Sequence, residues 1–161
     1  MDKKEVPPCK VLFVCLGNIC RSPMAEALLK RKTGPEKVVV DSAGLDAYHL
    51  GEPPCALTMK ECARHGCHPE HRARLFRTED FDRFDLIYVM DHYNLEEVLN
   101  KARNEDDRRK VKLILDEIYP GEGLEVPDPY MRGGEMIRIV YELLDKATDR
   151  IARKIAEGEC R

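Results

Sequence analysis

The segment VLFVCLGNICRSPMAE places the thiol of Cys15 and the guanidinium of Arg21 at the two ends of a short loop. A thiolate is a strong nucleophile, and a guanidinium presents a planar fork of N–H groups that fits an oxyanion. Between them, Gly17 and Asn18 are residue types that tolerate the left-handed backbone of a tight turn. These residues together predict a loop that holds a phosphate-like dianion beside a reactive sulfur.

The expected position of this loop favours the same chemistry. Residues 10–14 form an apolar run typical of a buried strand, and Pro23 opens a helical pattern, so the loop joins a strand to a helix. Backbone N–H groups at a helix start bind anions and stabilise a thiolate. We therefore expect Cys15 to be a thiolate at neutral pH that attacks phosphorus in line, with Ser22 donating a hydrogen bond to it.

Transfer of a phosphoryl group to sulfur also needs an acid that protonates the leaving oxygen. The best candidate is Asp128 in the segment EVPDPY, because two prolines stiffen this segment and present the carboxylate. A turn or helix-capping aspartate before the last helix is the alternative interpretation, and spacing alone favours it.

Strands and helices alternate along the rest of the chain. Further strands are expected at residues 38–40, 86–90 and 111–115, and helices at 54–65, near 81, at 95–102 and at 135–156. This order predicts an α/β fold: a Rossmann-like open sheet of four parallel strands with helices on both faces and the phosphate-binding loop after the first strand. Such sheets bind ligands at the carboxyl ends of their strands.

The 161 residues predict a single domain, at residues 10–158, with a candidate mobile extension at 1–9 and a tail at 159–161. A charged fraction of 35% and a hydrophobic fraction of 43% are typical of a soluble globular protein. The net charge of −3 argues against a nucleic-acid-binding protein. With no long apolar run and a polar start, we expect no membrane partner and a cytoplasmic location.

Five segments together resemble the low-molecular-weight protein tyrosine phosphatases: CLGNICRSP at 15–23, VDSAG at 40–44, HRAR at 71–74, MD at 90–91 and DPY at 128–130. The resemblance implies that Cys15 forms a phosphocysteine and that Arg21 and the backbone of residues 16–21 bind the phosphoryl oxygens. It implies that Asp128 protonates the leaving phenolate and then activates water. No metal or organic cofactor is implied.

The resemblance also implies roles for residues around the loop. Asn18 holds the left-handed turn, supported by Ser22, Ser42 and His71. Tyr48 and Tyr130 flank a phenyl ring whose floor is lined by Leu16 and Ile19. The substrate-binding set is therefore Leu16, Gly17, Asn18, Ile19, Cys20, Ser22, Tyr48 and Tyr130. The expected partners are a phosphotyrosine protein or small aryl phosphate, with inorganic phosphate or a similar oxyanion in the loop, bound by a monomer or weak dimer.

Three other activities compete with phosphotyrosine hydrolysis. Related bacterial arginine phosphatases typically carry threonine where this chain has Ile19, and isoleucine favours an aryl phosphate. Broad phosphomonoesterase activity is the second alternative. Arsenate reduction shares the fold and loop but needs a cysteine relay, and Cys55, Cys62 and Cys67 lie earlier in the chain than such a relay is expected.

The seven cysteines of this chain favour reduced thiols over a disulfide framework, because their number is odd and the chain can build a sizeable core. The cluster at residues 62–71, CxxHxCHxxH, departs from the paired spacing of structural zinc sites, so no metal is predicted. Cys20 lies at the other end of the loop from Cys15. The family resemblance implies that it traps an oxidised Cys15 as a disulfide before irreversible oxidation.

Overall fold

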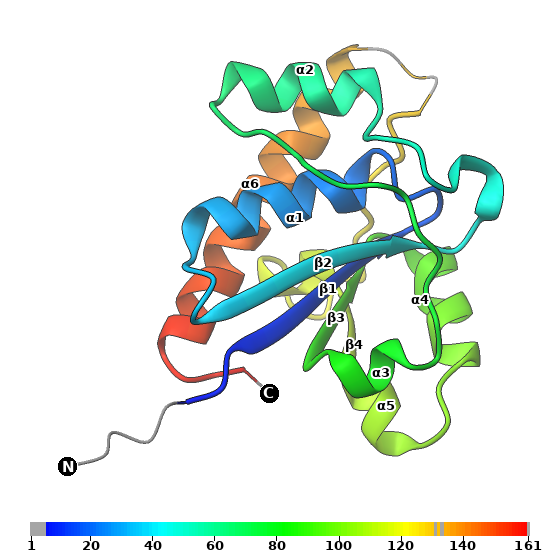
Figure 1. Cartoon of the computed structure of the whole chain (residues 1–161), viewed down its shortest axis with the longest axis vertical. Helices are drawn as coiled ribbons and strands as arrows, with labels where there is room; N and C mark the ends of the chain where they lie inside the picture. The colour runs from blue at the N-terminus through cyan, green and yellow to red at the C-terminus, as the bar shows by residue number, and fades with distance from the viewer. Residues whose placement is uncertain (1–5, 131, 133, 161) are drawn as a thin grey trace.

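The computed structural model describes residues 6–130, 132 and 134–160 (Figure 1). Its sheet has four parallel strands in the order β2-β1-β3-β4. The strands are β1 (Cys9–Cys15), β2 (Val38–Gly44), β3 (Leu86–Val89) and β4 (Val111–Leu113). The chain leaves β1 to one side for β2 and then crosses to β3 on the other side. A crevice suited to ligands therefore opens at the carboxyl end of β1.

Helices cover both faces of the sheet, which confirms the predicted fold class (Figure 1). The elements α1 (Arg21–Lys32), α2 (Ala56–Arg64) and α6 (Gly134–Ala156) lie on one side, and α3 (Asp80–Arg83), α4 (His92–Asn100) and α5 (Glu105–Arg109) lie on the other. Strand β1 contributes side chains to the hydrophobic core on each face of the sheet. Val11 and Phe13 pack toward α1 and α6, while Leu12 and Val14 pack toward α3 and α4. A strand buried on both faces reads as a continuous apolar run.

Two local predictions differ from the structure. The strand expected at 111–115 ends at Leu113, and the buried residues after it form a 3₁₀ turn, η2 (Ile114–Glu117). An apolar run alone cannot separate a strand from a buried turn. Residues 105–109, where no helix was expected, form α5, because the Asn104 side chain accepts a hydrogen bond from the N–H of Asp107 at 2.9 Å and caps it.

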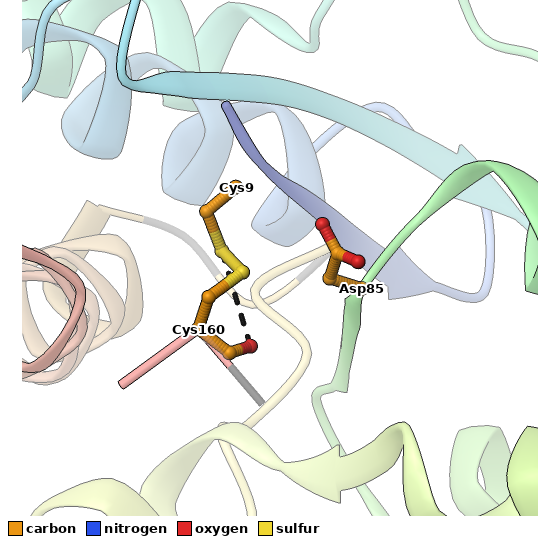
Figure 2. A group of neighbouring side chains, drawn as sticks. All are labelled: Cys9, Asp85 and Cys160. Atoms are coloured by element: carbon orange, nitrogen blue, oxygen red, sulfur yellow. Dashed lines mark hydrogen bonds between the residues drawn. A yellow bond between two sulfur atoms is a disulfide. The ribbon is translucent and has the colours of Figure 1, made fainter. Parts of the chain in front are cut away.

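The expectation that all cysteines are reduced is wrong for one pair. Cys9, the first residue of β1, forms a disulfide with Cys160, which follows α6, and their Cα atoms lie 5.7 Å apart (Figure 2). Asp85 lies beside this bond, and its carboxylate accepts a hydrogen bond from the N–H of Lys10 at 2.9 Å. The pairing joins residues 151 positions apart, so no local pattern indicates it. The predicted extension at 1–9 includes residues 1–5, which lie outside the described residues.

The disulfide is expected to stabilise the fold, because it closes a loop of 151 residues and so restricts the unfolded chain. Reducing it should lower the free energy of unfolding by about 2–5 kcal/mol and the Tm by about 5–15 °C. Thermal unfolding with and without a thiol reductant measures this difference. A double variant, Cys9→Ser with Cys160→Ser, should unfold at the lower temperature in both conditions. Equal Tm values for the oxidised and reduced wild type contradict the prediction.

None of the helices within the described residues combines the length and the apolar character that crossing a bilayer requires.

Candidate active site

A cavity of about 300 Å³ opens at the carboxyl end of β1, beside the loop that leads into α1. Nine of the residues singled out from the sequence line it, together with Asp46 and His49. The nine are Cys15, Leu16, Gly17, Ile19, Cys20, Arg21, Tyr48, Asp128 and Tyr130. The fold therefore brings the predicted nucleophile, cation and acid around one space, although Asp128 is distant from the loop in the chain.

Asn18 has a left-handed backbone, with φ of 57°, and both the oxygen and the nitrogen of its side-chain amide are hydrogen-bonded. Its Oδ1 accepts hydrogen bonds from the N–H of Arg74 at 3.0 Å and from Nε2 of His71 at 2.7 Å. Its Nδ2 donates to Ser22 Oγ at 2.8 Å and to Ser42 Oγ at 3.0 Å. A non-glycine residue in this conformation persists only where its surroundings hold it, and these four bonds supply that restraint.

The loop turns several of its carbonyl oxygens away from the cavity. The carbonyl of Leu16 accepts hydrogen bonds from the N–H groups of Leu45 and Asp46, at 2.8 and 2.9 Å. The carbonyl of Ile19 accepts from the N–H of Cys55 at 2.7 Å. Because these oxygens bond outward, the opposite edge of the peptide chain, which carries N–H groups, is available to an anion.

Gly44, the last residue of β2, lets the loop sit close to the sheet. A Cβ atom at this position would lie 2.9 Å from Cβ of Asn18 and 3.0 Å from the carbonyl oxygen of Leu16. Real Cβ atoms do not approach other atoms so closely. The glycine of VDSAG is therefore required by the packing of the loop against the end of β2.

The thiol of Cys15 is buried and lies 3.0 Å from Ser22 Oγ. The direction of this hydrogen bond follows from the network behind it. A backbone N–H can only donate, so the atom of Asn18 that faces Arg74 is its oxygen and the atom that faces Ser22 is its NH₂ group. Ser22 Oγ accepts from that group, which leaves its own hydrogen for the sulfur. The predicted donation from Ser22 to Cys15 fits this arrangement.

Glu26, in α1, anchors the network, although no motif in the sequence marked it as a site residue. Its Oε1 accepts a hydrogen bond from Ser42 Oγ at 2.6 Å and lies 3.2 Å from Nδ1 of His71. Only 3% of Glu26 is exposed. A carboxylate on the inward face of an expected helix is the signal that could have indicated it. Through Ser42 and His71, Glu26 fixes the side chain of Asn18.

Arg21 is 2% exposed, and its guanidinium is held by two hydrogen bonds and lies near a second carboxylate. Nη1 donates to Asp91 Oδ2 at 2.8 Å and to the carbonyl of Val126 at 2.9 Å, and Nη2 lies 3.7 Å from Asp128 Oδ2. Burial alone would lower the pKa of Arg21, but the nearby Cys15 sulfur and the hydrogen bond to Asp91 raise it above its ordinary value. Arg21 is therefore a permanent cation aimed at the cavity.

Asp128 closes a local turn and also faces the cavity, so its geometry is compatible with both interpretations of its sequence context. Its Oδ1 accepts a hydrogen bond from the N–H of Tyr130 at 3.0 Å, which closes a local turn. Its Oδ2 faces Arg21 across the cavity, and 45% of the side chain is exposed. The turn sets the position of the carboxylate, and its exposure leaves room for a substrate oxygen or water. The turn hydrogen bond at Oδ1 therefore leaves Oδ2 available to the cavity.

Three rings stand at the mouth of the cavity, where the sequence indicated two. The ring of His49 lies between those of Tyr48 and Tyr130, with centroid distances of 4.8 and 5.5 Å and edge-to-face geometry. Nδ1 of His49 is 3.1 Å from Glu52 Oε2. His49 follows Tyr48 directly in the chain, but only the fold shows that it turns into the cavity. An aromatic group entering this site meets all three rings.

The cysteines and histidines of residues 62–71 lie in separate environments. Cys62 and Cys67 are buried in the main hydrophobic core. His65 stacks on Tyr141 with a centroid distance of 3.9 Å, and His71 belongs to the network behind the loop. Within the described residues, the groups of three metal-ligand atoms that lie together include neither Cys62 nor Cys67.

A buried thiol, a fixed guanidinium and an exposed carboxylate around one aromatic-walled cavity are the parts that a cysteine-dependent phosphatase requires. Residues 10–159 match the family model described as low molecular weight phosphotyrosine protein phosphatase. The chain belongs to this family, which confirms the predicted family and enzyme class.

Known proteins resemble the chain over nearly its whole length. A Schizosaccharomyces pombe protein named low molecular weight phosphotyrosine protein phosphatase is 39% identical over 152 residues, covering 91% of this chain and 97% of that protein. The crystal structure of a protein tyrosine phosphatase from Entamoeba histolytica superimposes with a TM-score of 0.87 at 35% identity, covering 94% and 99% of the two chains. A Drosophila arginine phosphatase superimposes with a TM-score of 0.80 at 34% identity, covering 89% and 96%.

Proposed function

We propose that this protein hydrolyses phosphotyrosine and related aryl phosphate monoesters through a phosphocysteine intermediate. The observation that carries the proposal is the single cavity in which Cys15, Arg21 and Asp128 meet. The proposed partners are a phosphotyrosine protein or a small aryl phosphate. The cytoplasmic location, the monomeric or weakly dimeric state and the domain boundaries at 10–158 remain predictions from the sequence.

In the first proposed step, the phosphoryl oxygens bind to the N–H groups of residues 16–21 and to Arg21. The thiolate of Cys15 attacks phosphorus, so that an S–P bond forms as the bond from phosphorus to the phenolic oxygen breaks. Asp128, in its acid form, gives its proton to that oxygen, and the phenol leaves. Arg21 keeps its positive charge during this step, because the nearby Cys15 sulfur and the Asp91 carboxylate raise its pKa.

In the second proposed step, the carboxylate of Asp128 takes a proton from a water molecule that attacks phosphorus. The S–P bond breaks, inorganic phosphate forms, and the sulfur leaves as a thiolate. The hydrogen bond from Ser22 stabilises this leaving group. The exposure of Asp128 gives water access to the carboxylate, which supports its use in both steps.

The walls of the cavity favour an aryl phosphate over phosphoarginine. Tyr48, His49 and Tyr130 offer ring faces and edges, and Ile19, which is 7% exposed, adds an apolar side chain. A phenyl ring gains dispersion and ring contacts here, whereas the side chain of Ile19 offers no hydrogen-bond acceptor to a guanidinium.

We expect kcat/KM for a phosphotyrosine peptide to exceed that for the matched phosphoarginine peptide by at least about 10-fold, since apolar contacts typically discriminate on this scale. Phosphate release from the two peptides, measured at equal concentrations, tests this. In the variant Ile19→Thr the preference should shrink. Faster release from phosphoarginine in the wild type contradicts the assignment and favours the activity named for the Drosophila relative.

We also propose that Cys20 protects Cys15 during oxidation. Both cysteines line the same cavity. A thiolate oxidised to sulfenic acid condenses with a nearby thiol to give a disulfide, which reductants reverse. Reaction with Cys20 would therefore stop the oxidation of Cys15 short of the irreversible sulfinic acid.

A further inference from the structure

A second thiol lies directly behind Cys20. Cys55 precedes α2, and its thiol interacts with the thiol of Cys20. The two residues share one small hydrophobic cluster with Ile19 and Ala73. Cys20 is 4% exposed, and Cys55 is partly buried. Neither thiol of this pair has a role in the hydrolysis itself.

Hydrogen bonds to the backbone of the phosphate loop hold Cys55 next to Cys20. The N–H of Cys55 donates to the carbonyl of Ile19 at 2.7 Å, and the hydroxyl of Thr58 donates to the carbonyl of Cys20 at 3.0 Å. The sulfur of Cys55 lies 3.4 Å from the same hydroxyl. The start of α2 is therefore tied to the phosphate loop on both sides of Cys20, and the contact between the thiols is a fixed feature of the fold.

The two thiols differ in acidity in a way that suits exchange. The interaction with Cys20 lowers the pKa of Cys55 to about 6 against the effect of burial, and the backbone N–H of Thr58 lowers it further. The same interaction, with burial, raises the pKa of Cys20 well above its ordinary range. Of the two thiols, Cys55 is therefore the one that more readily gives up its proton. A thiolate is the species that attacks a disulfide.

We propose that Cys20 and Cys55 form a disulfide by exchange, which returns an oxidised Cys15 to its thiolate without an external reductant. The proposal rests on the proposed function, because it takes Cys15 as the working thiolate. It assigns to Cys55 a redox role at the rear of the loop.

The steps balance with a peroxide as the oxidant. The Cys15 thiolate attacks hydrogen peroxide, giving the sulfenic acid and hydroxide. Cys20 condenses with the sulfenic acid, so that a Cys15–Cys20 disulfide forms and water leaves. Cys55 gives its proton to the hydroxide and attacks the sulfur of Cys20 as a thiolate, the bond to Cys15 breaks, and Cys15 leaves as a thiolate. In sum, two electrons from Cys20 and Cys55 reduce one peroxide.

The direction of the last step follows from the leaving group. Cys15 departs into a site that stabilises its negative charge, with Ser22 as donor at 3.0 Å and Arg21 nearby as a buried cation. A stabilised thiolate leaves a disulfide faster than an unstabilised one. The disulfide is thereby moved from the catalytic sulfur to a pair that the hydrolysis does not use.

The test oxidises prereduced enzyme with one equivalent of hydrogen peroxide, then follows aryl phosphate turnover without reductant and maps disulfides by peptide mass spectrometry. In the wild type, most of the activity should return while a Cys20–Cys55 disulfide accumulates. In Cys55→Ser, activity should stay at least about 10-fold below its starting value until dithiothreitol is added, with Cys15–Cys20 as the mapped bond. The control Cys62→Ser, which alters a cysteine of α2 packed in the main core, should behave as the wild type.

Two results overturn the proposal: a wild type in which oxidation stops at Cys15–Cys20, or a Cys55→Ser variant that recovers as the wild type does. Failure of the proposed function has a different signature. If the reduced wild type turns over no aryl phosphate, the phosphatase assignment fails, while the disulfide map still reports whether exchange takes place.

Discussion

Replacing Cys15 by serine is expected to abolish aryl phosphate turnover, with a loss on the order of 10⁴-fold or more, because the removed group forms the covalent bond to phosphorus. A serine hydroxyl stays protonated in a site whose N–H groups and Arg21 are arranged for an anion. Initial rates with a nitrophenyl phosphate measure the loss.

The matched control for this variant is oxyanion binding. Cys15→Ser should still bind inorganic phosphate in a calorimetric titration, since Arg21 and the loop backbone are unchanged. Turnover within about 10-fold of the wild type would show that another group attacks phosphorus. Loss of both phosphate binding and thermal stability would point to a disrupted loop instead of a missing nucleophile.

Replacing Asp128 by asparagine is expected to lower kcat by about 10²-fold or more, the usual contribution of a general acid. The loss should be larger for a phenyl phosphate than for a nitrophenyl phosphate, because a poor leaving group needs the proton more. Rates measured across phenols of graded acidity reveal this trend.

Asp46 supplies the matched control, since its carboxylate also lines the cavity. It accepts a hydrogen bond from the N–H of Tyr48 at 2.7 Å and serves as the cap of the 3₁₀ turn η1 (Ala47–His49). Asp46→Asn should therefore keep kcat within a few-fold of the wild type and show no trend with the leaving group. Equal effects of the two substitutions would remove Asp128 from its proposed role.

The loop from Cys15 to Pro23 was predictable because its function is local. One strand end, one turn and one helix start carry the nucleophile, the anion-binding backbone and Arg21 in a single segment. The fold class was predictable for a similar reason, since buried strands and amphipathic helices are patterns of neighbouring residues.

The parts that the sequence did not indicate depend on long-range packing. Asp91 bonds Arg21 and Glu26 bonds the Asn18 network, and the residues next to Asp91 and Glu26 in the chain do not show which partner each one binds. The sequence pattern did not indicate His49, because its side chain faces the cavity only as a result of the 3₁₀ turn η1. The bond between Cys9 and Cys160 joins the two ends of the described fold, which no spacing rule connects.

The central claim is that the sulfur of Cys15 carries the phosphoryl group during turnover. Rapid acid quenching of the wild type during turnover of a radiolabelled aryl phosphate, followed by digestion and peptide mass spectrometry, tests it directly. Label is expected on the peptide that contains Cys15, before free phosphate accumulates. Label on any other residue, or steady turnover with no labelled peptide at any quench time, would contradict it.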